Sequence, residues 1–151
     1  MVEIDLQVAD VSSSLPAHPD FLNWVTRAVN HRRMDAEVSI RIVTEDESRS
    51  LNYKYRGKNT PTNVLSFPTE FPPGVEVSLL GDLVICANIV TREAKAQNKS
   101  VQAHWAHMVI HGTLHLLGYQ HAERADAEKM ESLEIEILHH LGYGNPYELI
   151  D

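Results

Sequence analysis

The sequence predicts one domain, residues 1–151, of the α/β (α+β) class, with a small sheet of about four strands covered by about five helices. Apolar and polar residues alternate with a period of two in residues 2–8 and 38–42, which is typical of strands with one wet face. Elsewhere, as in residues 20–33, apolar residues recur at helical intervals. Both patterns are mixed along a chain long enough for one domain with a substantial core.

The elements can be placed in order by their patterns and by their caps. Asp20, Thr44 and Ser100 are expected as N-caps, and Thr44 with Glu47 has the spacing of a capping box. The predicted strands cover 2–8, 38–42, 63–68 and 79–86, and the predicted helices cover about 20–33, 44–53, 88–98, 101–117 and 122–141.

The last predicted helix has an apolar face and a strongly acidic remainder. Met130, Leu133, Ile137 and Leu141 recur at helical spacing and are expected to face the core. Residues 123–136 hold six acidic and two basic residues, and we expect the acids to form the solvated outer face of this helix.

Overall composition favours a soluble, cytoplasmic protein without a membrane segment. No apolar run is long enough to span a bilayer, and the N-terminus does not have the pattern of a secretory signal. The single cysteine, Cys86, lies in an apolar run and is expected to be a buried thiol. Thirteen Lys and Arg against twenty-one Asp and Glu give a net charge of −8, which argues against sequence-blind binding to nucleic acid.

One segment departs from this acidic average. Residues 48–69 contain no Asp or Glu, and two tyrosines, Tyr53 and Tyr55, lie among its basic residues. These basic residues are Arg49, Lys54, Arg56 and Lys58. An acidic protein can therefore still present one local basic surface beside its active site.

Three histidines lie close together in residues 111–121. His111 and His115 are four residues apart on a predicted helix, so both imidazoles leave the same face, separated by about 6 Å along the axis. Gly118 is expected to end the helix and turn the chain, which brings His121 to the same ion. Three nitrogen ligands with a fourth position open are typical of catalytic zinc. We therefore expect one Zn²⁺ per chain, with nickel as the other candidate.

This spacing is that of the long zinc-protease motif, with one difference. The Glu that acts there as general base is replaced by Gly112. A peptidase would need another base, for which Asp82 and His107 are candidates. His107 lies one turn before the first ligand, so contact with substrate, proton relay and a structural hydrogen bond are all open for it.

At these residues the sequence resembles a known family, the YbeY endoribonucleases that mature bacterial ribosomal RNA. The family signature His-Gly-x-Leu-His-Leu-x-Gly-Tyr-Asp-His matches residues 111–121 except at Gln120, where Asp is usual. The similarity also covers segments 55–58, 61–68 and 80–84. The resemblance implies a mixed sheet and a zincin-like metal helix.

The resemblance also implies an activity and partners. The expected activity is metal-dependent, single-strand-selective cleavage of precursor ribosomal RNA at the 3′ end of the small-subunit species, with a role in ribosome quality control alongside the small subunit and assembly factors. Arg56 matches the arginine that the family places in its active cleft, and guanidinium suits charge developing on phosphoryl oxygens. We expect Lys58 to guide the RNA backbone and Tyr55, or Tyr53, to stack a base.

Two other classes of function remain open. A metallopeptidase is possible only with a substitute for the missing Glu. A non-catalytic assembly factor would use zinc to organise a surface that faces the ribosome. Incubation of the metal-loaded protein with single-stranded RNA, duplex RNA and unfolded polypeptide separates the three classes.

Overall fold

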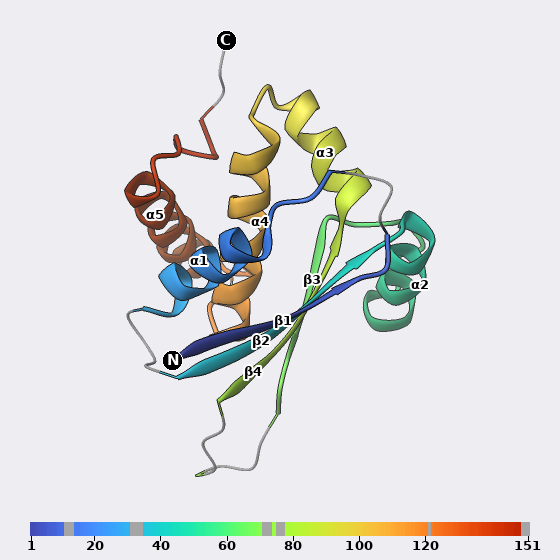
Figure 1. Ribbon diagram of the computed structural model, residues 1–151, viewed down its shortest axis with the longest axis horizontal. Coiled ribbons are helices and arrows are strands. Elements are labelled where there is room, and N and C mark those ends of the chain that lie inside the picture. The colour runs from blue at the N-terminus through green and yellow to red at the C-terminus, as the bar shows by residue number, and fades with distance from the viewer. Residues whose placement is uncertain (11–13, 31–34, 71–73, 75–77, 121, 149–151) are drawn as a thin grey trace.

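The computed structural model describes residues 1–10, 14–30, 35–70, 74, 78–120 and 122–148. The strands are β1 (Val2–Val8), β2 (Ala36–Val43), β3 (Val64–Pro68) and β4 (Leu79–Cys86). The helices are α1 (His18–Val29), α2 (Glu45–Arg56), α3 (Ala87–Ala96), α4 (Val101–Leu116) and α5 (Arg124–His140) (Figure 1). The predicted class, with four strands and five helices, is confirmed. None of these described helices combines the length and the apolar character needed to cross a membrane.

The four strands form one mixed sheet in the order β1-β2-β4-β3. β1 pairs with β2 and β2 with β4 in parallel, whereas β3 pairs with β4 in the antiparallel direction. β3 is therefore an edge strand, and it is in contact with α4, the helix that carries the predicted metal ligands.

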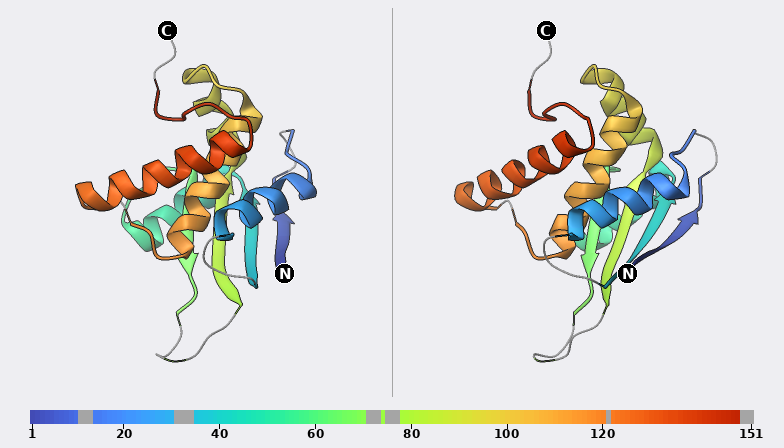
Figure 2. Two further views of the ribbon diagram at one scale, coloured as in Figure 1. Left: turned by 90° about the vertical axis from the view of Figure 1, so that its left-hand side faces the viewer. Right: turned by 60° about the vertical axis from the view of Figure 1, so that its left-hand side comes forward.

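Helices cover both faces of this sheet. Along β4, Leu83 and Ile85 join the main core under α1 and α4, whereas Val84 and Cys86 join a second, smaller cluster with Leu51 of α2. Successive residues of a strand point to opposite faces, so α2 lies on the face opposite α4. Figure 2 shows this arrangement, with α1, α4 and α5 on one side of the sheet. Cys86 is buried as expected.

The start of α1 corrects the predicted cap. The N-cap is Ala17, and Asp20 is the third residue of the helix, where its carboxylate accepts a hydrogen bond from the Ala17 backbone N–H at 3.1 Å. Pro19 explains the difference, because a residue without an N–H fits the first turn, where N–H groups have no helical partner. The predicted end of this helix, residues 31–33, lies outside the described residues.

The end of α2 also differs from the prediction. Thr44 caps the helix as expected, accepting a hydrogen bond from the Glu47 backbone N–H at 3.2 Å. The helix continues past Tyr53 to Arg56, because its first left-handed residue is Gly57, at φ +72°. Arg56 therefore ends a helix and does not lie in a loop.

The acidic residues of α5 are not all on its outer face. Glu134 is fully buried, so the expectation of a solvated position was wrong for this residue. It lies one turn after Met130 and one turn before Leu138, two other buried residues of the same helix. Its side chain reaches the histidines of α4, and these supply the hydrogen bonds that a buried carboxylate needs.

Gly112 lets α4 lie directly against the sheet. A Cβ atom at this position would be 2.7 Å from Leu83 Cδ2 and 3.3 Å from both Ser66 Oγ and Val64 Cγ2. The space that a side chain would need at residue 112 is thus filled by β3 and β4. Close packing at Gly112 therefore sets the distance between α4, which carries the histidines, and the sheet.

We expect Gly112→Ala to destabilise the protein by about 1–3 kcal/mol, the range for an overpacked core. The loss should appear although Ala favours a helix over Gly by up to about 1 kcal/mol. Urea unfolding measures the free energy of unfolding. Gly144→Ala is the control, because no atom lies within 4 Å of its added Cβ. A Gly112→Ala variant as stable as the wild type would show that α4 can move off the sheet.

Candidate metal centre

Four histidines follow one another along one side of α4. The ring centroids of His104, His107, His111 and His115 are separated in turn by 6.1, 6.1 and 4.7 Å. Ser100 begins the helix as predicted, because its hydroxyl accepts a hydrogen bond from a backbone N–H of the first turn at 3.1 Å. His104 and His107 are buried, whereas His111 and His115 are partly exposed. The outer end of the row is therefore the part open to solutes.

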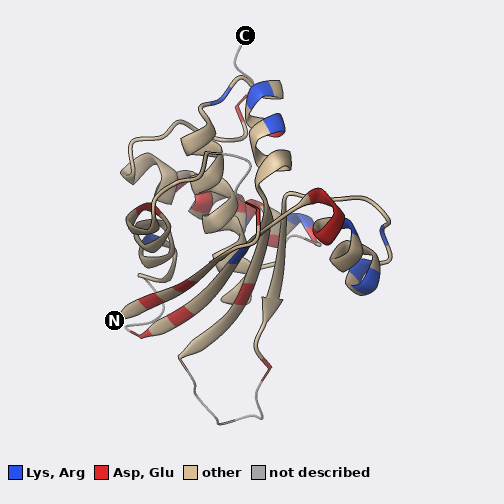
Figure 3. Ribbon diagram, turned by 45° about the vertical axis from the view of Figure 1, so that its right-hand side comes forward, with Lys and Arg blue, Asp and Glu red and all other residues tan. Residues whose placement is uncertain are grey.

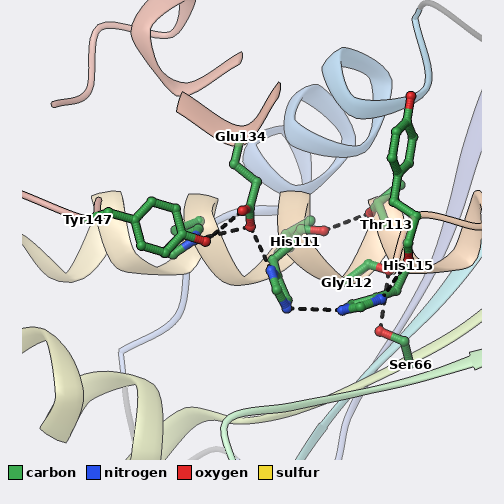
Figure 4. A network of polar contacts seen from close by, with 10 residues as sticks. Ser66, His111, Gly112, Thr113, His115, Glu134 and Tyr147 are labelled. Carbon is green, nitrogen blue, oxygen red and sulfur yellow. Dashed lines mark hydrogen bonds and ion pairs between the residues drawn. The ribbon is translucent and has the colours of Figure 1, made fainter. Parts of the chain in front are cut away.

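Glu134 determines the tautomer of neutral His111, that is, which ring nitrogen carries the proton. The distance from His111 Nδ1 to Glu134 Oε1 is 2.6 Å (Figure 4). An ionised carboxylate can only accept, so the proton of neutral His111 is on Nδ1. The lone pair is then on Nε2, at the opposite side of the ring.

Neutral His115 has the same tautomer, but a backbone carbonyl determines it. Its Nδ1 lies 2.9 Å from the backbone carbonyl oxygen of Tyr119, which can only accept a hydrogen bond. This carbonyl is within reach because Gly118, at φ +102°, reverses the chain after α4, as the sequence predicted. The Tyr119 N–H then bonds back to the Leu114 carbonyl at 3.1 Å. The lone pair of neutral His115 is therefore also on Nε2.

The two Nε2 atoms face each other at 3.2 Å (Figure 4). Two lone pairs at this distance repel unless a proton or a metal ion lies between or beside them. Two nitrogen ligands of a tetrahedral zinc ion, each at about 2.0–2.1 Å, are separated by about 3.3–3.4 Å. The pair formed by His111 and His115 thus fits a metal ion. His121, the third predicted ligand, lies outside the described residues.

A second group of residues with metal-binding atoms adjoins this pair. Atoms of His107, His111 and Glu134 lie within 4.8 Å of one another, which is compatible with a metal site. However, the 2.6 Å between His111 Nδ1 and Glu134 Oε1 is shorter than the spacing of two ligands on one tetrahedral ion and fits a shared proton. This group is better described as a hydrogen-bonded support behind His111.

Tyr147 completes this support. Its hydroxyl donates to Glu134 Oε2 at 2.6 Å, and His107 Nε2 lies 3.2 Å from Glu134 Oε1 and 3.3 Å from the Tyr147 oxygen. His107 is thus buried against Glu134 and Tyr147, and it does not line the cleft that contains Arg56. Of the interpretations left open for His107, the observed contacts favour a structural hydrogen bond.

The charge of this support follows from its hydrogen bonds. Burial by itself raises the pKa of Glu134, but hydrogen bonds from His107, His111 and Tyr147 outweigh burial and hold that pKa at about 2. Burial lowers the pKa of His107, so its ring is neutral at pH 7. Burial and the adjacent carboxylate raise the pKa of Tyr147, which remains a hydroxyl donor. Glu134 is therefore an ionised acceptor that receives hydrogen bonds from His107, His111 and Tyr147.

A cleft of about 640 Å³ joins the histidine pair to Arg56. Arg56 reaches it from the last turn of α2, and His111 and His115 reach it from α4. The remaining lining residues are Thr62, Asn63, Val64, Leu65, Ser66, Pro68, Leu116, Gly118, Tyr119 and Gln120. The tertiary structure thus brings the predicted arginine and two of the three predicted ligands to one cleft.

Lys58 and Tyr55 lie outside the lining of this cleft, although both are exposed near it. The Tyr55 ring packs edge-on against Phe67 of β3, with 4.9 Å between the ring centroids. α2 has acidic residues in its first turn and basic residues, Lys54 and Arg56, in its last turn. Figure 3 shows these opposite charges at the two ends of α2. The basic end is the end near the cleft.

Buried polar side chains of α2 fix the wall of the cleft. The Ser48 hydroxyl donates to the Thr62 carbonyl at 3.0 Å and accepts from the Thr62 N–H at 2.9 Å. Asn52 donates to the Thr60 carbonyl at 2.8 Å. These bonds hold the segment between α2 and β3 against the helix that carries Arg56.

Glu134 and Tyr147 were missed in the sequence. For Glu134 a signal existed, because it lies four residues after Met130 and three before Ile137, on the apolar side of the helix. An acid at such a position calls for a buried partner. Tyr147 follows the last helix and has no periodic context, so its contact with Glu134 depends on how the chain end folds back.

Comparison with known proteins identifies a family for this chain. The family described as endoribonuclease YbeY matches residues 7–142. The chain is also similar to the solution structure of TM1509 from Thermotoga maritima, with 26% sequence identity, 98% of this chain and 99% of that chain covered, and a TM-score of 0.58. The family match, residues 7–142, spans the positions of Arg56, His111 and His115 and ends before Tyr147. Because the family match spans most of the sequence, the chain belongs to the YbeY family of endoribonucleases.

Proposed function

We propose that residues 1–151 form one metal-dependent endoribonuclease domain that cuts single-stranded RNA. The observation that carries this proposal is one cleft that is lined by Arg56 and by two histidines, His111 and His115, whose Nε2 atoms are 3.2 Å apart. Membership of the YbeY family supports endoribonuclease activity and a role in ribosomal RNA processing. The proposed substrate is precursor ribosomal RNA, at the 3′ end of the small-subunit species.

His111, His115 and His121 would hold one zinc ion, with nickel as the alternative metal. When bound, the ion supplies Lewis-acid charge to a phosphodiester. The two described histidines support this ligand set, because both present a lone pair on Nε2 to the same point. Their Nδ1 atoms are already used by Glu134 and by the Tyr119 carbonyl.

Arg56 would stabilise negative charge on the non-bridging phosphate oxygens. Its guanidinium is planar and permanently charged, and its backbone is in the last turn of α2, beside the cleft. Lys58, just beyond the helix, would attract the backbone of the RNA. Tyr55 is exposed and braced by Phe67, so its ring would stack an unpaired base, which favours single strands.

The described geometry gives little support to a metallopeptidase. The position that holds the general base in zinc proteases is Gly112, and the sheet fills the adjoining space. Asp82 alternates with Leu83 on β4, so it points to the face of the sheet opposite α4. His107 is buried against Glu134. Each candidate base is thus unsuited to the cleft.

We infer that the protein works in the cytoplasm on the small ribosomal subunit, together with assembly factors, in maturation and quality control. The net charge of −8 opposes general attraction to RNA, whereas the basic end of α2 is next to the cleft. Such a distribution suits a nuclease that is brought to its RNA by partners rather than one that cuts every RNA it meets.

The first test is a comparison of substrates. Zinc-loaded protein should cleave a single-stranded RNA, leave a duplex of the same sequence largely intact, and leave an unfolded polypeptide intact. Gel analysis of end-labelled substrates measures all three, with protein stripped by a chelator as control. Cleavage of the polypeptide would favour the peptidase, and cleavage of none would favour the non-catalytic assembly factor.

Two variants separate the proposed metal ligands from the proposed charge stabiliser. His115→Ala should lose metal and cleavage together. Arg56→Ala should keep its metal and its fold but lose about two to three orders of magnitude in single-turnover cleavage, the scale for one charge stabiliser. Elemental analysis and thermal melting accompany the kinetics. Arg49→Ala is the matched control, since Arg49 is exposed on the same helix and outside the cleft. Wild-type cleavage by Arg56→Ala would remove this residue from the mechanism.

Lys58→Ala should affect binding more than cleavage. Loss of one phosphate contact should lower the slope of log affinity against log salt concentration by about 0.7 for a single strand. Fluorescence anisotropy with a labelled RNA at several salt concentrations measures this slope. Lys95→Ala, an exposed lysine of α3 outside the cleft, is the control. An unchanged slope would mean that Lys58 makes no contact with the backbone.

A further inference from the structure

A buried carboxylate and a phenol lie behind His111, at the ring nitrogen that does not face His115 (Figure 4). Glu134 comes from α5, and Tyr147 comes from the segment that follows α5. Neither residue is on α4, and neither lines the cleft that contains Arg56. A residue of α5 thus contacts the predicted metal ligand His111, and a residue of the following segment contacts that α5 residue.

The geometry gives each oxygen of Glu134 a distinct task. Burying a carboxylate is unfavourable unless its oxygens are hydrogen-bonded. The Tyr147 hydroxyl donates a hydrogen bond to Oε2 at 2.6 Å, whereas both histidines contact Oε1. His111 Nδ1 approaches Oε1 at 2.6 Å, the closer of the two histidine contacts. The strongest of these bonds to histidine is therefore the one that sets the proton of His111.

The segment that carries Tyr147 is itself anchored. The Tyr147 N–H donates to the Asn145 side-chain oxygen at 2.8 Å, which forms a local turn. Lys99, in the turn between α3 and α4, donates to the Pro146 carbonyl at 2.8 Å. The first bond fixes the local turn, and the second ties the segment to the residues just before α4, so the phenol reaches Glu134 from an anchored backbone.

We propose that Glu134 and Tyr147 are positioning residues, which hold His111 in the tautomer and orientation that present Nε2 to the metal. This inference rests on the metal site of the proposed function. Tyr147 lies beyond residues 7–142, the part of the chain that matches the family. Partners of this kind, hydrogen-bonded to a ligating histidine, change metal affinity by about 10–100-fold when they are removed.

The test is the zinc affinity of folded variants, measured without RNA by competition with a chromophoric chelator. Glu134→Gln keeps the shape but loses the charge, and it should bind zinc about 10–100-fold more weakly. Tyr147→Phe removes one hydroxyl and should weaken zinc binding in the same direction by a smaller factor. His111 and its neighbours on α4 are unchanged in both variants.

Two matched controls lie close by. Glu131 is on the same helix and lines the same cavity of about 390 Å³ as Glu134, and among the described residues no hydrogen bond joins it to a histidine. Tyr143 is in the same terminal segment as Tyr147 and packs against the core. Glu131→Gln and Tyr143→Phe should both bind zinc with wild-type affinity.

A spectroscopic measurement separates positioning from mere stabilisation of the fold. Long-range ¹H–¹⁵N spectra of the metal-free wild type should show the proton of neutral His111 on Nδ1. In Glu134→Gln the ring should populate both tautomers, whereas a purely structural role would leave the tautomer unchanged. If Glu134→Gln does not fold, Tyr147→Phe and the tautomer of the wild type decide the question.

The outcomes distinguish this inference from the proposed function. Wild-type protein that binds no zinc would contradict the metal site, and the inference with it. Wild-type zinc binding with unchanged affinity in both variants, or a His111 proton on Nε2, would overturn the positioning role alone. Complete loss of zinc in folded Glu134→Gln would make Glu134 a ligand, which also overturns it.

Discussion

The hydrogen bond between Glu134 and His111 is the interaction on which the arrangement of the site depends. It turns the lone pair of His111 toward His115, because the ionised carboxylate keeps the proton on Nδ1. It also ties α5 to α4 through the fully buried carboxylate of Glu134. Glu134 in turn needs the Tyr147 hydroxyl, so the terminal segment, α5 and α4 form one connected polar system inside the protein.

A second constraint sets the position of that system relative to the substrate cleft. Gly112 brings α4 into direct contact with β3 and β4, and the same strand β3 forms one wall of the cleft. On the other side, Ser48 and Asn52 fix the segment before β3 to α2. The position of the α2 backbone at Arg56 relative to α4 is therefore decided by packed helices and buried hydrogen bonds, and a scaffold of this kind suits charge stabilisation in a transition state.

The division of charge fits the proposed reaction. The negative charge of Glu134 is buried behind His111, outside the lining of the cleft that an incoming phosphate would enter. Positive charge lies at the outer end of α2, on the solvent side of the cleft. The proposed RNA substrate would thus meet cationic groups first, although the protein as a whole is acidic.

Local patterns in the sequence determined the types of all nine elements, the caps at Thr44 and Ser100, the reversal at Gly118 and the common face of His111 and His115. These features depend on residues within one or two turns of each other, for which spacing alone is informative. Only the tertiary structure decided the order of the strands, the burial of Glu134, the docking of Tyr147 and the meeting of Arg56 with the histidines. The residues that meet in these contacts are 13 or more positions apart, and their distances follow from how whole helices pack on the sheet, which no local pattern encodes.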